Sequence, residues 1–320
     1  MTRIDAHQHF WRPVRGDYGW LTPGAHPAIC RDFGPEDLAP CLLQARIDRT
    51  VLVQAAPTEA ETRFLLEIAR TTPFVAGVVG WTDLAAAEAP ARVFAMAQDP
   101  KLLGLRPMLQ DLDDAAWILR ADVAPALDAM EAASLRFDAL ATPRHLPHLL
   151  RLADRRPGLK LVIDHGAKPD IAGGALTDWA AAMRALAGGS AAVCKLSGLA
   201  TEAGAGWTAD TLCPFVDVLI DAFGPARLMW GSDWPVVNEA GGYAAWRSAA
   251  EALTEGCSAA DRAPPWALTR ATIRVSSSKN AAQTASPRMW RRTRMPTAHP
   301  ELMAARPATP ATPSANAAAR

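Results

Sequence analysis

Short apolar runs rich in branched residues alternate along the chain with longer segments of helix-like periodicity. Runs of this kind predict strands, and the amphipathic segments between them predict helices. Asp122 and Thr177 have the side chains of helix caps and are expected to cap two of these helices. Strands are predicted near residues 3–9, 50–56, 74–81, 102–108, 135–141, 159–165, 191–198 and 228–234, and helices at Ala60–Thr71, Ala85–Ala97, Asp122–Ala133, Leu146–Arg155 and Leu176–Ala187.

Eight strand–helix alternations predict a parallel sheet of the α/β class, most economically closed into a (β/α)8 TIM barrel. In such a barrel the functional side chains gather at the C-terminal ends of the strands. His7 and His9 lie two residues apart and are expected on one face of their strand. The polar residues at or near strand ends are His7 and His9 in the first run, Arg106 in the fourth, His165 in the sixth, Lys195 in the seventh and Asp233 in the eighth.

Composition narrows the class of protein. Half of the 320 residues are hydrophobic, which is enough for a large core, and no run of about 18 apolar residues predicts a membrane span. Asp5 and His7 interrupt the N-terminus at once, so no secretory signal is expected. The cysteines are widely spaced and form no C-x-x-C pair, which favours reduced thiols and a cytoplasmic protein. They are Cys30, Cys41, Cys194, Cys213 and Cys257.

Charge is divided unevenly along the chain. From Arg262 to the end there are 10 basic residues and one acidic residue, which leaves 23 basic and 32 acidic residues in 1–261. The body therefore carries −9, and this acidity argues against a nucleic-acid enzyme. After Ala263 the periodicity is lost, and the Ala-, Pro- and Arg-rich composition predicts disorder rather than a membrane- or nucleic-acid-binding tail.

Seven short segments of the sequence occur in the order found in the amidohydrolase superfamily. They resemble in particular its branch of L-fuconolactonase-like and 2-pyrone-4,6-dicarboxylate-lactonase-like enzymes. The resemblance runs from about residue 3 to about residue 250. The segments are Asp5–Trp11, Val51–Ala55, Gly77–Trp81, Gly104–Met108, Ile163–Pro169, Cys194–Leu199 and Met229–Pro235.

The resemblance implies a barrel, spanning 1–262, that hydrolyses lactones, often those of sugar acids. His7, His9, His165 and Asp233 fall on the family's active-site positions. Members of the family differ in metal use: some hold one divalent ion such as zinc, and others hold none. The segment 263–320 does not resemble the family's usual end, and we hypothesise that a reading-frame shift near Arg262–Pro264 replaced it.

Elementary chemistry agrees with these roles. The carboxylate of Asp233 is the best candidate for the base that activates water. His7, His9 and His165, with Asp233, are the candidate ligands of a metal with one position open for water. Without a metal, a histidine or Arg106 would have to stabilise the oxyanion. Arg106 and Lys168 are the candidate substrate-binding residues for carboxylate or hydroxyl groups.

Several positions leave alternatives open. Arg106 stands where binuclear relatives carry a bridging lysine or carboxylate, and Asp138 stands where a histidine is common, so two metals are not expected. Asp5 and Asp164 either orient an imidazole or stabilise a loop. Lys195 either faces the barrel or packs its stem and pairs with an acid. Trp81, Trp230 and Trp234 are expected in the core more than on a substrate, and His26, His145, His148 and His299 at the surface or in loops.

The sequence thus predicts a hydrolase that opens a small-molecule lactone, with residues 12–48 as a long insertion over the barrel mouth. Neither nucleic acid nor membrane is an expected partner, and the sequence does not indicate an oligomeric state. A metal-dependent decarboxylase of the same superfamily and an inactive ligand-binding barrel remain alternatives.

Overall fold

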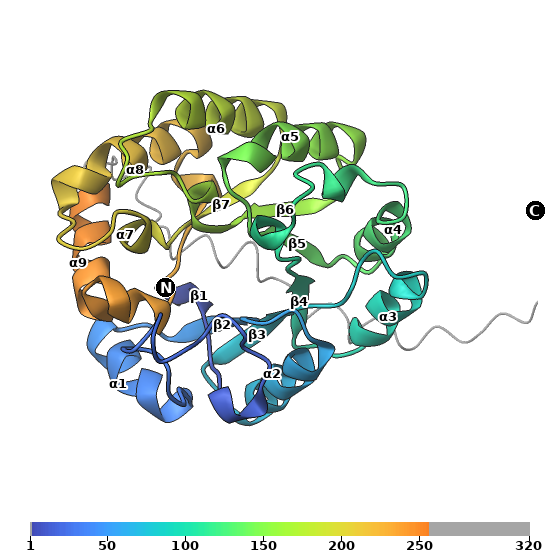
Figure 1. Cartoon of the computed structure of the whole chain (residues 1–320), viewed down its shortest axis with the longest axis horizontal. Coiled ribbons are helices and arrows are strands. Elements are labelled where there is room, and N and C mark those ends of the chain that lie inside the picture. Colours follow the sequence, from blue (N-terminus) through green and yellow to red (C-terminus); the bar gives the residue numbers. More distant parts are fainter. Residues whose placement is uncertain (1, 256–320) are drawn as a thin grey trace, which may run out of the picture. The chain divides into compact units, whose positions relative to one another are not determined.

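Eight parallel strands form one sheet in the order of the sequence, from β1 to β8 (Figure 1). The computed structural model describes residues 2–255. The strands are β1 Ile4–Gln8, β2 Arg49–Val53, β3 Val75–Gly80, β4 Leu102–Leu105, β5 Arg136–Ala139, β6 Lys160–Ile163, β7 Val193–Leu196 and β8 Leu228–Trp230. The predicted (β/α)8 barrel is confirmed, and each predicted strand is present in a shorter form.

The segment after β8 closes the sheet against β1. The backbone N–H of His9 donates to the carbonyl of Trp234 at 2.7 Å, and that of Asp233 donates to the carbonyl of His7 at 2.8 Å. Closure leaves the barrel without a free edge strand, and it places the ends of the first and last strands side by side.

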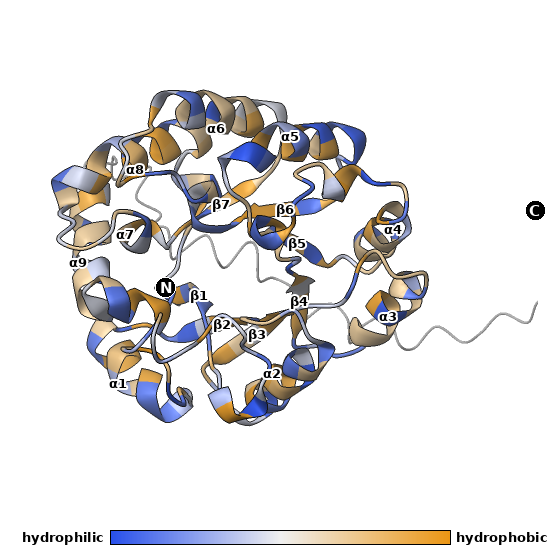
Figure 2. Ribbon diagram, viewed as in Figure 1, coloured by the Kyte–Doolittle hydropathy of each residue, from blue (hydrophilic) through white to orange (hydrophobic). Residues whose placement is uncertain are grey.

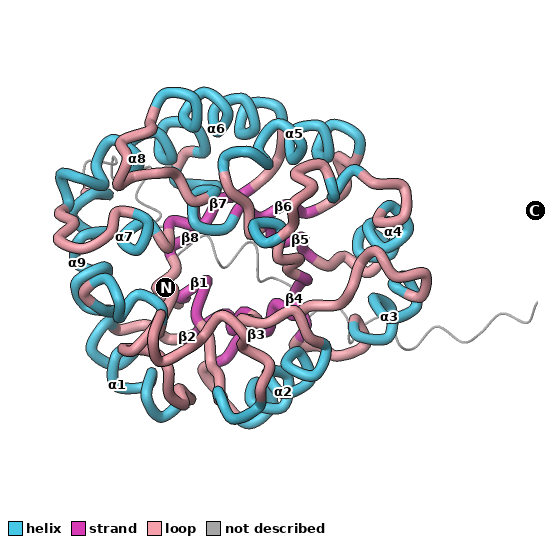
Figure 3. Tube along the Cα trace, viewed as in Figure 1, coloured by secondary structure: helices cyan, strands magenta, loops and turns pink. Residues whose placement is uncertain are grey.

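Helices surround the strands in a ring, as Figures 1 and 3 show. Hydrophilic residues lie on the outer turns of helices such as α5 (Figure 2), which buries Leu146, Leu149 and Leu152 at intervals of three. The helices of the described part are α1 Pro35–Ala45, α2 Glu59–Thr71, α3 Ala89–Met96, α4 Ala124–Ala132, α5 Leu146–Arg155, α6 Thr177–Gly189, α7 Leu199–Glu202, α8 Ala209–Phe223 and α9 Gly242–Thr254.

The two expected helix caps are wrong. Asp122 precedes α4 by two residues, and its carboxylate accepts a hydrogen bond from Arg120 instead of from the helix. Thr177 is the first residue of α6, so it lies inside the helix, and no side chain caps that end. A capping side chain must belong to the residue just before the helix, and that residue is Val123 for α4 and Leu176 for α6.

The barrel interior is divided into an apolar part and a polar part. Asp5 accepts from the hydroxyl of Tyr243 on α9, so its side chain points outward. The pairing of β1 with β2 shifts register between Asp5 and Gln8. Ile4, on the opposite face of the strand, belongs to a small apolar cluster with Val51 and other residues of β2 to β4. The polar residues of the site lie beyond this layer.

Part of the insertion between β1 and β2 packs as a small core of its own. Trp11 pairs with Phe33 through backbone hydrogen bonds, and its indole N–H donates to the carbonyl of Arg31 at 3.0 Å. Within residues 2–255 no helix is long and apolar enough to cross a membrane. The predicted tail 263–320, Cys257 and His299 lie outside the described residues, so the domain boundary and the frame-shift hypothesis stay predictions.

Candidate active site

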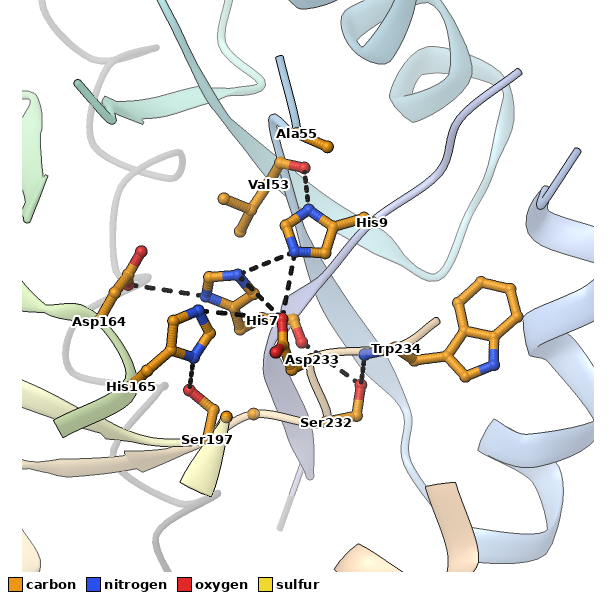
Figure 4. Close-up of polar contacts among 12 residues, drawn as sticks. His7, His9, Val53, Ala55, Asp164, His165, Ser197, Ser232, Asp233 and Trp234 are labelled. Atoms are coloured by element: carbon orange, nitrogen blue, oxygen red, sulfur yellow. Dashed lines mark hydrogen bonds and ion pairs between the residues drawn. The ribbon is translucent and has the colours of Figure 1, made fainter. Parts of the chain in front are cut away.

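Three histidines and one aspartate converge at the C-terminal ends of β1, β6 and β8 (Figure 4). The Asp233 Oδ1 lies 3.2 Å from the Nε2 of His9, 3.7 Å from that of His7 and 3.9 Å from that of His165. The two Nε2 atoms of His7 and His9 are 3.2 Å apart. The four residues expected to share one site therefore do meet, and all four are buried.

Two of these side chains sit on unusual backbone. His165 has φ 53° and Asp233 has φ 57°, which is the left-handed region that side chains seldom adopt. Backbone hydrogen bonds from Lys168 to His165 and from Val237 to Asp233 hold these turns in place. A Cβ added at Gly198 would lie 2.6 Å from the His165 Nδ1, so this glycine makes room for the imidazole. Such strain is typical of functional sites.

Neighbouring groups orient the imidazoles. The His9 Nδ1 lies 2.8 Å from the carbonyl oxygen of Val53, which can only accept, so Nδ1 carries the proton. In the neutral ring the Nε2 of His9 is then a lone pair directed at Asp233. The His165 Nδ1 lies 2.9 Å from the Oγ of Ser197, which holds that ring from behind.

The electrostatics favour the neutral imidazole at His7 and His165 and the ionised carboxylate at Asp233. Burial, and then the charge of Lys195, holds the pKa of His7 well below its ordinary value. Burial also lowers the pKa of His165, to about 4. For Asp233 burial acts to raise the pKa, but the surrounding imidazoles of His165, His9 and His7 outweigh it and leave the pKa below its ordinary value.

This donor set fits a divalent metal. The ligand atoms of His7, His9 and Asp233 all lie within 4.8 Å of one another. The lone pair of His9 faces a carboxylate oxygen at 3.2 Å, and two acceptors facing each other need a cation or a proton between them. Neutral imidazoles and an ionised carboxylate are the ligands that zinc takes in catalytic sites, where one position stays open.

A network of buried charges lies next to His7. The Asp164 Oδ1 is 2.8 Å from the Nζ of Lys195 and 3.6 Å from the His7 Nδ1, and the Oδ2 accepts from Arg106 at 3.2 Å. Lys195 also contacts Asp138 at 2.5 Å. Asp164 therefore lies beside an imidazole, as the first of its two expected roles requires. Lys195 both faces the barrel and pairs with acids, so its two expected roles are combined.

A pocket of about 340 Å³ opens above the four residues. Trp20 and His26 of the insertion line its wall next to Trp11, which supports the expectation that residues 12–48 lie over the barrel mouth. Trp20 donates its indole N–H to the carbonyl of Ala55 at 2.9 Å. The complete lining is His9, Trp11, Trp20, His26, Ala55, Arg106, Met108, Gln110, Asp111, Leu140, His165, Lys168, Asp233 and Val236.

Arg106 and Lys168 both line this pocket, as a substrate-binding role requires. Each is already paired with an acid of the protein. Arg106 donates to Asp164 at 3.2 Å, and the Nζ of Lys168 lies 3.4 Å from Glu202. Because the charges of Arg106 and Lys168 are already balanced by Asp164 and Glu202, the pocket is poorly suited to a ligand with several negative charges.

The expectations for the other tryptophans and histidines have mixed outcomes. Trp230 and Trp234 are buried in the core as expected, and Trp81 does not line the pocket. His145 is 1 % exposed, because its ring turns back on the Thr142 backbone, so its expected surface position is wrong. His148 lies half-buried in α5 rather than in a loop.

His26 does lie in a loop, but it also lines the pocket, which the pattern of the sequence did not indicate. Its Nδ1 lies 3.0 Å from both carboxylate oxygens of Glu239, a residue that follows β8. Trp11, Trp20 and His26 were missed as site residues, because the insertion lacks the periodicity that locates a side chain. Only the expectation that this insertion covers the mouth pointed to them.

Comparison with known proteins gives consistent results. The family model described as amidohydrolase matches residues 4–264. An L-fucono-1,5-lactonase of Burkholderia ambifaria is 53 % identical over 247 residues, covering 76 % of this chain and 85 % of the relative. An L-fucono-1,5-lactonase of Burkholderia multivorans is 40 % identical over 281 residues, covering 84 % and 94 % of the two chains.

Among solved structures, a Burkholderia multivorans amidohydrolase with bound zinc superposes with a TM-score of 0.81 at 39 % identity. The match covers 86 % of this chain and 100 % of that one. Its zinc agrees with a donor set in this chain that can hold a metal. Family model, sequence relatives and barrel agree, and the chain belongs to the amidohydrolase family.

Proposed function

We propose that this protein hydrolyses a lactone of a sugar acid, with water as the nucleophile and the Asp233 carboxylate as the base. One observation carries the proposal: the buried carboxylate of Asp233, whose pKa lies below its ordinary value, is surrounded by three imidazoles at the floor of a small pocket. The relatives named L-fucono-1,5-lactonase, at 53 % and 40 % identity over most of the chain, support the same reaction.

In this mechanism Asp233 accepts a proton as the water oxygen bonds to the ring carbonyl carbon. The carbon–oxygen bond of the ring then breaks, and the proton passes to the ring oxygen, which becomes a hydroxyl. The product is a hydroxy acid, which releases a proton at neutral pH. His9 and His165 are held by Val53 and Ser197, so their inward nitrogens are positioned in advance.

A divalent ion, zinc being the best candidate, would be held by His7, His9 and Asp233, with His165 adjacent. When bound, such an ion polarises a carbonyl group and lowers the pKa of water. The Arg106 guanidinium, 3.4 Å from the His7 Nε2, adds positive charge to the same corner of the site. This charge supports the developing oxyanion.

The pocket favours a neutral, monocyclic substrate. Its volume of about 340 Å³ is at the small end of ligand sites, which span roughly 300–1,000 Å³. Arg106 and Lys168 are each neutralised by a protein carboxylate, whereas Asp111 and Asp233 bring negative charge to the lining. A pyrone dicarboxylate would need unpaired cations to replace its hydration, so a polyhydroxylated sugar lactone is the better fit.

The test is hydrolysis of a panel of aldonolactones, with a pyrone dicarboxylate and an aromatic hydroxy acid as comparisons, followed by proton release. Asp233→Asn should lower kcat by about 10²–10⁴, the usual contribution of a general base. Asn keeps the shape and tolerates the positive φ of 57° at this position. Asp178→Asn, an exposed aspartate of α6, is the matched control and should change nothing.

Full activity in folded Asp233→Asn would refute the assigned base. Carbon dioxide release from the aromatic acid, without lactone turnover, would point to the decarboxylase alternative instead. A folded protein that binds lactones without opening them would point to the inactive barrel.

A further inference from the structure

The site contains two overlapping groups of residues that have the chemistry of metal ligands. One group is His7, His9 and Asp233, and the other is His7, Asp164 and His165. In each group the ligand atoms lie within 4.8 Å of one another, and every member is buried. Because the groups share His7, two ions bound there would be close neighbours.

The second group already contains a cation of the protein. The Nζ of Lys195 lies 2.8 Å from the Asp164 Oδ1 and 3.2 Å from the His7 Nδ1, and so contacts two of the three ligands. Its other neighbour is the Asp138 Oδ2, at 2.5 Å. The ammonium thus has two carboxylate partners, and the His7 Nδ1 is its third close neighbour.

The remaining oxygen of Asp164 is also taken. Its Oδ2 accepts from the Arg106 guanidinium at 3.2 Å, so each oxygen of this carboxylate has a cationic partner. Asp138 and Asp164 balance Lys195 and Arg106 in charge, and all four side chains are buried. A divalent ion added beside Lys195 would face a like charge at close range and would have to displace it from Asp164.

In the first group a protein cation contacts one ligand instead of two: the Arg106 Nη1 lies 3.4 Å from the His7 Nε2. The nearest side-chain partners of the Asp233 Oδ1 are the imidazole nitrogens of His9, His7 and His165. Lys195 contacts His7 through Nδ1, whereas Asp233 and His9 face its Nε2. The two nitrogens of His7 thus belong to different halves of the site.

We propose that the Lys195 ammonium is the resident cation of the His7–Asp164–His165 group and prevents a divalent ion from binding there. The ammonium takes the place of a second ion, since it lies between the carboxylates of Asp138 and Asp164 and contacts the Nδ1 of His7. The barrel then takes a metal only at the His7–His9–Asp233 group. This inference concerns occupancy of the site and does not depend on which substrate is hydrolysed.

The experiment counts zinc ions per chain. Metal-free full-length protein is dialysed against dilute zinc chloride, and bound zinc is measured by mass spectrometry, with circular dichroism to verify folding. Lys195→Met removes the ammonium and keeps the length of the side chain, so the number of bound ions should rise by one. Adding Asp164→Asn to that variant should remove the extra ion. Lys168→Met, the same charge change on the pocket wall, is the matched control and should add none.

A second comparison is independent of whether Lys195→Met folds. In an otherwise wild-type chain, Asp164→Asn should leave the number of bound zinc ions unchanged, because Asp164 contacts Lys195 and Arg106 instead of a metal. Loss of one ion in that variant would overturn the proposal, since the second group would then hold a metal. Folded Lys195→Met with no additional ion would overturn it as well.

Discussion

Glu61 in α2 makes the stability of this barrel depend on pH. Its carboxylate is buried below the pocket wall and accepts backbone hydrogen bonds from Ala55, at 3.0 Å, and from Ala56, at 2.8 Å. Burial raises its pKa from 4.5 to about 7, although these hydrogen bonds act to lower it. The native state therefore retains a proton that the unfolded chain releases.

The magnitude follows from the difference between the two pKa values. Below pH 4.5 both states are protonated, so Glu61 adds no penalty; as the pH rises through 7 the native state must bury a charge. The difference of about 2.5 units, at about 1.4 kcal/mol each, makes folding less favourable by about 3.5 kcal/mol well above pH 7. Glu61→Gln does not titrate and should lack this loss.

The assay is denaturant unfolding, followed by tryptophan fluorescence, of wild type and Glu61→Gln between pH 5 and 8. The free energy of unfolding of wild type, relative to the variant, should fall by about 2.5 kcal/mol across this range, because part of the loss has already occurred below pH 5. Glu67→Gln, which removes an exposed carboxylate of the same helix, is the control. A wild-type-minus-variant difference that stays constant with pH would refute the reasoning.

Two further predictions concern the site. Gly198→Ala should lower kcat by at least tenfold with a smaller effect on substrate affinity, because the new Cβ would lie 2.6 Å from the His165 Nδ1 at a backbone φ of 68°; steady-state kinetics beside a melting curve will check this, and unchanged kcat would contradict it. His26→Ala should raise KM for a sugar lactone severalfold and leave kcat nearly unchanged, because the ring lines the pocket mouth and contacts Glu239 rather than Asp233. An unsubstituted six-membered lactone, which has no hydroxyls to recognise, is the control substrate, and an equal rise for both lactones would argue against hydroxyl recognition.

The barrel was predictable because most of its strands stand out in the sequence as short runs of apolar residues. β3, β4 and β8 are buried apolar runs, which is what a parallel sheet covered by helices requires. β1 and β5 also carry polar residues, but they are buried along their whole length. The predicted runs extend past the observed ends, as at residues 102–108 against Leu102–Leu105. There the chain leaves the sheet at Arg106 and Pro107, and proline has no N–H to continue a ladder.

The convergence of His7, His9, His165 and Asp233 was also predictable, because strand ends in a barrel share one rim. The sequence did not predict which aspartate lies beside which histidine. Asp5 and Asp164 have similar positions relative to a histidine, yet Asp5 faces outward to Tyr243. The Oδ1 of Asp5 also accepts from the backbone N–H groups of His7 and Ser232, and the contact with Ser232 exists only once the first and last strands meet.

The charges of the barrel interior explain why Asp233 suits a base or a ligand. Asp138 and Asp164 are balanced by Lys195 and Arg106, so this network adds no net charge at the site. Asp233 is then the unbalanced charge at the floor of the pocket, and its nearest side chains are the imidazoles of His9, His7 and His165. A buried anion without a cationic partner attracts a proton from water or a divalent ion, and either outcome favours attack on a carbonyl. If Lys195 were lost, Asp138 and Asp164 would compete with Asp233 for a divalent ion. The buried ammonium of Lys195 therefore leaves Asp233, on the pocket side of His7, as the carboxylate that binds such an ion.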